Sequence, residues 1–110
     1  MYRFIWKIKL NDDVSDEVFI AHWHDASAIL QDYPGARGTL IHRSRDEPKT
    51  FFLVAQWESQ ELRDKMQAEI DAGETERAKR WQKFPPSETL GEIQAMFAGE
   101  QIGEVVPPVL

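Results

Sequence analysis

Three histidines are the clearest candidates for acid–base chemistry in this chain, because imidazole titrates near neutral pH. His22 lies at the edge of the apolar stripe of a predicted helix, so it could face a pocket and accept a proton from a phenol or enol. His24 lies on the opposite side of that helix and is predicted to be exposed. His42 lies on a predicted strand and could line either face of a sheet. We predict His22 as a catalytic residue and His42 as a substrate-binding residue; for His22 the alternative is a boundary histidine satisfied by Asp25 or water.

The spacing of the possible ligands does not favour a metal site. His22 and His24 are two residues apart, which directs their imidazoles to different sides of a helix. His22 and Asp25 have the spacing of a helical ligand pair, but two ligands are too few for a typical site. The chain has no cysteine, so thiolate ligands, disulfides and a cysteine nucleophile are excluded. Phosphate loops, dinucleotide fingerprints and serine-nucleophile motifs are also missing from the sequence, and we predict neither a metal nor any other cofactor.

Four tryptophans are many for a chain of 110 residues. An indole ring can pack in a core or stack against a planar ligand. Trp57 ends a predicted strand, where its alternative role is to fix the junction with the following helix. A pocket lined by aromatic rings suits a flat, apolar substrate. The predicted substrate-binding tryptophans are Trp6, Trp23, Trp57 and Trp81.

Strands and helices must position these side chains, and hydrophobic periodicity predicts both. Apolar and charged residues alternate at the start of the chain, which is the period of a pleated strand. Phe19, Trp23, Ala26 and Leu30 recur at helical spacing and form one apolar stripe. The expected strands cover residues 2–10, 37–44, 50–57 and 90–97, and the expected helices cover residues 16–31, the segment between a Ser59 cap and Gly73, and residues 74–84.

This order of elements is the split βαβ, ferredoxin-like pattern of the α+β class, with a four-stranded antiparallel sheet and its helices on one face. The strand over residues 50–57 is apolar on both sides, because Phe52 and Val54 oppose Phe51 and Leu53. A solvated sheet face would carry polar residues at these positions. The second face therefore needs a cover, and we predict that a second copy of the chain supplies it in a homodimer.

The length favours one domain, which we place at residues 1–98. Residues 99–110 are predicted to form an extended C-terminal arm, since two prolines interrupt its apolar residues. We expect the arm to cross onto the partner subunit or to cover a sheet edge. Its apolar residues are Ile102, Val105, Val106, Val109 and Leu110.

The composition is that of a soluble globular protein, with 42% hydrophobic and 29% charged residues. A net charge of −6 argues against nucleic acid and anionic membranes as partners. No apolar run approaches the roughly 20 residues that a membrane-spanning helix needs. The first residues carry regular charges and do not form a signal peptide, so we predict a cytoplasmic location.

Two segments carry a resemblance to a known family. Residues 51–61, FFLVAQWESQE, resemble the strand-to-helix junction of the antibiotic biosynthesis monooxygenase (ABM) domains, and residues 33–36, YPGA, resemble their proline–glycine turn. The similarity in order and spacing extends over roughly residues 2 to 97. Residues 19–23 also resemble the Phe-x-x-x-Trp helix of the related EthD-like proteins. The resemblance implies a homodimer in which two sheets close into a dimeric α+β barrel, with a pocket between each sheet and its helices.

The resemblance implies several possible activities. Its superfamily includes cofactor-independent quinol and polyketide monooxygenases, haem-degrading enzymes and isomerases. The resemblance implies that the haem-degrading branch carries an asparagine on the first strand, where this chain has none before Asn11, and a tryptophan and a histidine that would fall near Met66 and near Glu76. We therefore predict a cofactor-independent monooxygenase acting on a planar phenolic, quinol or polyketide-like compound. The alternative is a non-catalytic small-molecule-binding or small isomerase module on the same dimeric barrel.

Overall fold

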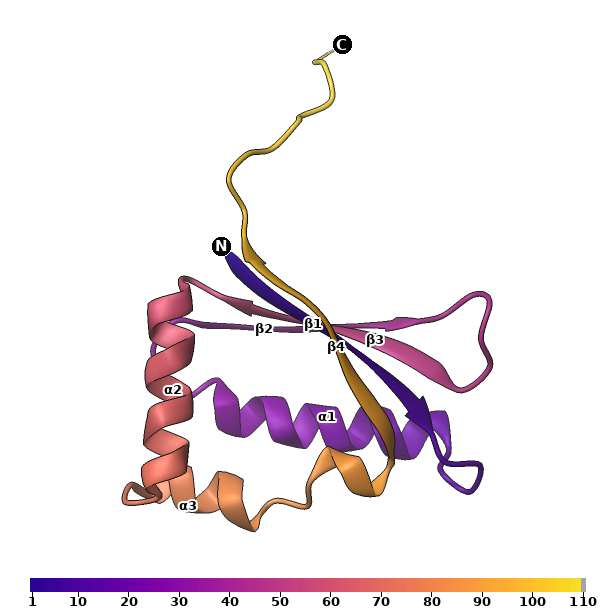
Figure 1. Cartoon of the computed structure of the whole chain (residues 1–110), viewed down its shortest axis with the longest axis vertical. Helices are drawn as coiled ribbons and strands as arrows, with labels where there is room; N and C mark the ends of the chain where they lie inside the picture. Colours follow the sequence, from indigo (N-terminus) through magenta and orange to yellow (C-terminus); the bar gives the residue numbers. More distant parts are fainter. Residues whose placement is uncertain (110) are drawn as a thin grey trace.

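The computed structural model describes residues 1–109, and Leu110, the last residue of the predicted arm, lies outside them. Four strands form an antiparallel sheet in the order β2-β3-β1-β4, and the helices lie together on one side of it (Figure 1). The predicted ferredoxin-like α+β fold is confirmed. The elements are β1 (Tyr2–Leu10), α1 (Asp16–Leu30), β2 (Ala36–Arg43), β3 (Thr50–Trp57), α2 (Gln60–Ala72), α3 (Glu76–Lys83), a short 3-10 helix η1 (Ser87–Thr89) and β4 (Gly91–Glu100).

Hydroxyl side chains start all three α-helices. Ser15, Ser59 and Thr75 each accept a hydrogen bond from the backbone N–H three residues further along the chain. Each bond satisfies one of the N–H groups that have no partner within the first helical turn. Gly73 ends α2 in the left-handed conformation, at φ 67°, which a glycine adopts without steric cost. The turn that follows leads into α3, which starts at the end of α2 and runs across its direction (Figure 1).

The core lies between the sheet and the helices. Even-numbered residues of β1 and odd-numbered residues of β3 face each other across the ladder and point toward the helices. One buried cluster joins the middle of the sheet to α1, and a second joins its other end to α2. The first contains Ile8, Leu10, Phe19, Trp23, Ala26, Phe51 and Leu53, and the second contains Tyr2, Tyr33, Trp57, Met66 and Ile70.

No element of residues 1–109 covers the opposite side of the sheet, which we call the open sheet face (Figure 1). Its central part is apolar, as the sequence predicts for β3. Leu40 and Phe97 leave 49% and 55% of their surface exposed there. The register places these apolar side chains around one patch: Ile5, Leu40, Phe52, Val54 and Phe97.

A β-bulge changes the prediction for β4. Alternation predicts Ile93, Ala95 and Phe97 on one face, but the register of β1 with β4 shifts between Ile5 and Trp6. Trp6 pairs with Ala95, and Ile5 pairs with Phe97, so Phe97 lies on the open sheet face while Ile93 and Ala95 face the helices. The expectation for Phe97 is wrong because an extra residue reverses the alternation.

The last strand is also longer than predicted and ends at Glu100. One further backbone hydrogen bond, from the Gln101 N–H to the Met1 carbonyl at 2.8 Å, closes the ladder. Residues 101–109 then form neither helix nor strand and extend away from the sheet (Figure 1). Ile102, Val105 and Val109 are almost fully exposed in this single chain. Within residues 1–109, no helix is long and apolar enough to cross a membrane.

Candidate active site

All four tryptophans of the chain line one cavity between the sheet and the helices. Its volume is about 140 Å³. Trp6 comes from β1, Trp23 from α1, Trp57 from β3 and Trp81 from α3, so four elements each contribute one indole ring. The sequence identifies these residues one by one, and the fold brings them together.

The indole rings make a rigid wall. The Trp6 and Trp23 rings meet edge to face, with 4.6 Å between their centroids. Trp23 and Trp57 are almost fully buried, and Trp6 and Trp81 are half-buried. Trp57 also belongs to the second core cluster, so its side chain both packs the strand-to-helix junction and faces the cavity.

The remaining cavity wall is apolar except at α2. Among residues 1–109, Arg63 is the only charged residue that lines the cavity, and Gln67 follows it one helical turn later. The guanidinium of Arg63 lies over the Phe4 ring, 4.8 Å from its centroid. Gln67 is exposed, so this part of the wall meets solvent. The apolar residues of the wall, besides the four tryptophans, are Phe4, Leu30, Ala55, Met66 and Ile70.

His22 lies beside the cavity but does not line it. Its Nε2 atom is 3.0 Å from the Ser87 hydroxyl oxygen, and its ring contacts Phe84 with 4.8 Å between centroids. Trp23, the next residue on α1, does line the cavity. Burial lowers the pKa of His22, and the nearby Asp25 carboxylate opposes this shift. His22 is therefore biased toward the neutral imidazole, which is the form that accepts a proton.

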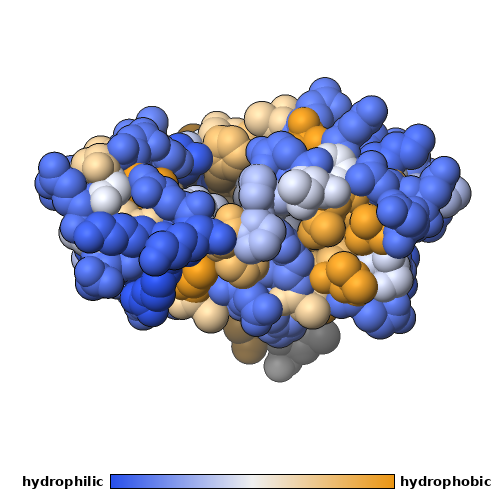
Figure 2. Space-filling view, turned by 90° about the horizontal axis from the view of Figure 1, so that it is seen from below, coloured by the Kyte–Doolittle hydropathy of each residue, from blue (hydrophilic) through white to orange (hydrophobic). Residues whose placement is uncertain are grey.

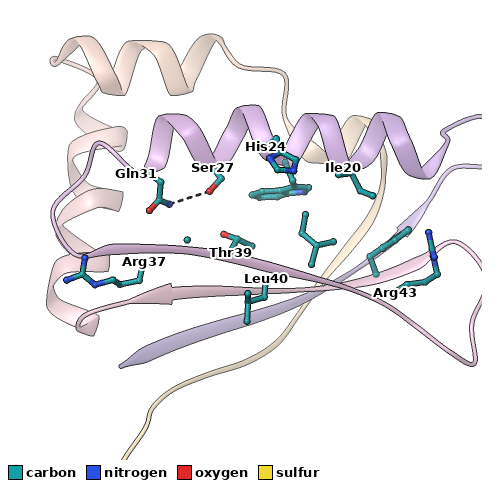
Figure 3. A pocket seen from close by; sticks show the side chains of 12 residues that line it. Ile20, His24, Ser27, Gln31, Arg37, Thr39, Leu40 and Arg43 are labelled. Atoms are coloured by element: carbon teal, nitrogen blue, oxygen red, sulfur yellow. Dashed lines mark hydrogen bonds between the residues drawn. The ribbon is translucent and has the colours of Figure 1, made fainter.

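The other two histidines lie elsewhere. His42 pairs with Phe52 and so lies on the open sheet face, away from the tryptophans. His24 lines a wide groove of about 820 Å³ between α1 and the edge strand β2. Figure 3 shows this groove, with Ser27 and Gln31 of α1 opposite residues of β2. The three histidines therefore do not converge on one site.

A cluster of hydrogen bonds around Arg77 connects α3 to α2 and to the turn after α1. Arg77 donates to both carboxylate oxygens of Glu69, at 2.5 and 2.6 Å, and to the Asp32 carbonyl at 2.7 Å. The hydrogen bonds from Arg77 lower the pKa of Glu69 to about 2. The Arg77 guanidinium also lies over the Tyr33 ring. This cluster holds α3, and with it Trp81, against α2.

The rest of the helix-bearing side is mostly hydrophilic. Seen from below the view of Figure 1, its surface shows only small hydrophobic patches between hydrophilic residues (Figure 2). Among residues 1–109, no three histidine, aspartate or glutamate side chains gather closely enough to hold a metal ion. The cavity walled by tryptophans is thus the candidate site with the most distinctive chemistry.

A comparison with known families matches most of the elements that wall this cavity. The family model described as antibiotic biosynthesis monooxygenase matches residues 1–68, which include β1, α1, β2 and β3 and most of α2. The chain belongs to the antibiotic biosynthesis monooxygenase family. No curated protein matches the chain. Of the four cavity tryptophans and Arg63, only Trp81 lies outside the matched residues.

Solved structures of the family share this fold. A Nitrosomonas europaea protein described as an antibiotic biosynthesis monooxygenase superposes with a TM-score of 0.62 at 16% identity, covering 94% of this chain and 100% of that one. SnoaB, a cofactor-independent oxygenase from Streptomyces nogalater, gives 0.59 at 16% identity, covering 94% and 97%. The heme-degrader MhuD from Mycobacterium tuberculosis gives 0.64 at 19% identity, covering 96% and 100%. At these identities the likeness shows the dimeric α+β barrel class of fold and no particular activity.

Sequence reasoning missed Arg63 and Gln67. The predicted apolar stripe of α2 is Leu62, Met66 and Ile70, and each of the two polar residues directly follows a member of that stripe. A helical projection places such residues at the border of the buried face. That border position was the available signal, but only the fold shows that a cavity lies behind it.

Proposed function

We propose that this protein is a cofactor-independent monooxygenase of planar phenols or quinols. The observation that carries the proposal is the convergence of Trp6, Trp23, Trp57 and Trp81 on one cavity of about 140 Å³. Flat indole walls can stack on an aromatic ring and keep water away from it. The family membership and the fold it shares with a cofactor-independent oxygenase support the same reaction class.

In the proposed reaction the substrate supplies all the electrons. A quinol loses a proton, and its electron-rich anion reacts with dioxygen. One oxygen atom replaces a ring hydrogen and stays on the product, which becomes a hydroxyquinone. The other oxygen atom leaves as water with the two hydrogens that the quinol has lost. The protein needs to stabilise the anion and exclude bulk water.

We propose His22 as the group that receives the proton. It is biased toward the neutral imidazole and adjoins Trp23 of the cavity wall, although its Nε2 atom is occupied by Ser87 at 3.0 Å. The variant His22→Ala should then lose most of the activity and keep the fold, because truncation at a boundary position costs little stability. Steady-state oxygen uptake measures the activity, and His24→Ala on the same helix is the matched control. Equal activity of His22→Ala and the wild type would eliminate His22 as the proton acceptor.

Oxygen uptake tests the proposed reaction itself. The purified protein, incubated in air with a panel of hydroquinones and anthrones, should consume oxygen faster than a heat-denatured control. The variant Trp81→Leu, which opens one wall of the cavity, should lower the rate. A panel without uptake above the denatured control would contradict the proposal.

One observation favours a second candidate, a non-catalytic binding module. Within the part of the chain that the structure describes, the cavity wall contains no histidine and no carboxylate, so no ordinary general base lines it there. Such a module, or a small isomerase, would bind quinols without oxygen uptake. Tryptophan fluorescence, titrated with the same panel, separates the two candidates when it is read beside the uptake assay.

We also propose that the protein acts as a homodimer. The apolar patch on the open sheet face is of the kind that rarely stays exposed on a monomer. A two-fold axis through this face would close two sheets into one barrel. The predicted boundary between residues 98 and 99 falls inside β4, which ends at Glu100. We further propose that the segment beyond this strand acts as an arm, with the exposed Ile102, Val105 and Val109 buried against the partner subunit.

A further inference from the structure

The shape and charge of the cavity point to a narrower class of ligand. We infer that the site selects a single-ring quinol that carries an anionic group, with the ring between the tryptophans and the anion at Arg63. That the ligand is a quinol rests on the proposed function. Its two parts, the size limit and the acid preference, come from independent features of the cavity.

The volume sets the size limit. An apolar protein cavity of about 150 Å³ binds one benzene molecule. The cavity here, at about 140 Å³, has space for one aromatic ring between its indole walls. A second fused ring held inside the walls, away from the opening, would have to displace Trp57, Met66 or Ile70, all of which are buried in the second core cluster. Forcing extra volume into such a packed wall is costly.

Arg63 sets the acid preference. Of the described residues it is the only charged one in the cavity wall, and its side chain is 26% exposed, so it lies where the cavity meets solvent. Within residues 1–109 its guanidinium makes no hydrogen bond to another side chain, and it has one loose ion pair, with Asp64 at 4.0 Å. Its five N–H donors are therefore largely available to a carboxylate or phenolate.

The neighbouring acidic residues of α2 are engaged with other partners. Glu61 pairs with Lys65 at 3.3 Å, and Glu69 is held by Arg77. Asp71 accepts a hydrogen bond from the Gln67 side-chain amide at 2.9 Å. Only Asp64 competes for Arg63, and it does so at a distance beyond hydrogen bonding. An anionic ligand at the mouth therefore meets the Arg63 guanidinium, whose only ion pair within residues 1–109 is the loose one with Asp64.

Arg63 is also held in place. Its guanidinium rests on the Phe4 ring, 4.8 Å from the centroid, so less side-chain freedom is lost when a ligand binds. The same charge would stabilise a phenolate formed on the bound ring. Arg63 is thus both a specificity residue and a residue that favours the reactive anion.

The test is an anaerobic binding titration, read by the quenching of tryptophan fluorescence. The probes are hydroquinone, which is neutral, 2,5-dihydroxybenzoate, which is a one-ring quinol with a carboxylate, and 1,4-dihydroxy-2-naphthoate, which adds a second ring. We expect the wild type to bind 2,5-dihydroxybenzoate about tenfold more tightly than hydroquinone, because a charge-assisted hydrogen bond adds to the stacking. The two-ring acid should bind about tenfold more weakly than the one-ring acid.

Variants assign the preference to Arg63. Arg63→Met keeps the apolar stem on Phe4 and should abolish the preference for the acid, whereas Arg63→Lys, which keeps the charge, should retain most of it. The matched control Lys65→Met removes an exposed charge two residues away, outside the cavity wall, and should keep the wild-type preference. Thermal midpoints of all variants establish that they are folded. A preference unchanged in Arg63→Met, or lost equally in Lys65→Met, would overturn the role of Arg63.

The outcomes also separate this inference from the proposed function. Equal or tighter binding of the two-ring acid would overturn the size limit, whatever the protein does with oxygen. Selective anaerobic binding without oxygen uptake in air would support the ligand class and contradict the monooxygenase. Oxygen uptake that shows no dependence on the acid group or on Arg63 would support the monooxygenase and overturn the inference.

Discussion

Trp57 combines a structural and a site role in one side chain. It ends β3 with only 4% of its surface exposed, packs in the second core cluster and lines the cavity. Truncation to alanine should lower the free energy of unfolding by about 3–5 kcal/mol, through lost burial and the void that remains. Urea denaturation of Trp57→Ala, compared with Trp57→Phe and the surface control Lys65→Ala, measures this. A loss below about 1 kcal/mol for Trp57→Ala would show that the ring contributes little to packing.

His22 should make the stability of the protein depend on pH. Burial lowers its pKa in the folded state below the ordinary 6.5, so the unfolded chain takes up the proton more readily. The contribution of neutral His22 is therefore complete above about pH 6.5 and is lost as the pH falls through the lower folded-state pKa. In urea titrations between about pH 7 and 5, His22→Gln should lose less stability than the wild type. The control His24→Gln, an exposed residue of the same helix, should follow the wild type, and identical slopes for all three proteins would contradict this assignment.

At the scale of elements, the start of β4 depends on close approach of two backbones. Gly91 pairs with Leu10, and a Cβ atom at Gly91 would collide with the Lys9 carbonyl oxygen. The variant Gly91→Ala should therefore lower the free energy of unfolding by about 1–3 kcal/mol, because the strand must shift to relieve the contact. Gly103→Ala is the matched control, since a Cβ there meets nothing within 4 Å. Equal midpoints of the two variants in thermal unfolding would contradict the tight β1–β4 contact.

Most of the elements were predictable because local signals agree with the fold. These signals each act over a few residues. They are the alternation in β1, the helical stripe around Phe19 and Trp23, and the hydroxyl caps at Ser15 and Ser59. Phe97 was not predictable, since a bulge reverses its side of the sheet and depends on pairing with a strand about ninety residues earlier in the chain.

The candidate site was predictable only in part, for a related reason. Residue type marks the four tryptophans as ring-binding candidates, but their common cavity depends on how four elements pack. Arg63 has the sequence surroundings of an ordinary surface arginine, and only the packing of α2 on the sheet places it at the cavity. His42 was predicted as a site residue but lies away from the cavity. Its position on a strand does not say which face of the sheet it occupies, and only the pairing with Phe52 decides this.

At the scale of the whole molecule, the open sheet face should hold two chains together. Sedimentation at micromolar concentration should give about twice the 12.8 kDa mass of one chain. Leu40→Asp or Phe97→Asp should shift the protein toward monomer, because each places a charge in the apolar patch. Val18→Asp is the matched control: Val18 is 54% exposed, much like Phe97, but lies on α1 on the other side of the sheet.

The arm can be tested in the same experiment. Deletion of residues 101–110 should weaken the dimer if Ile102, Val105 and Val109 are buried against the partner, because their apolar surface is then lost from the interface. An unchanged dimer after deletion would show that the arm does not hold the partner. A wild-type protein that stays monomeric at micromolar concentration would overturn the two-sheet barrel itself.

In the proposed function, the cavity walled by tryptophans lets a quinol react with dioxygen without a cofactor. Incubation of the purified protein and a one-ring quinol under oxygen-18 gas, followed by mass spectrometry of the product, tests it most directly. We expect one oxygen-18 atom in each hydroxyquinone molecule and the other in water, at a rate that falls in Trp81→Leu. Product without the label, or labelling at the same rate with denatured protein, would contradict it.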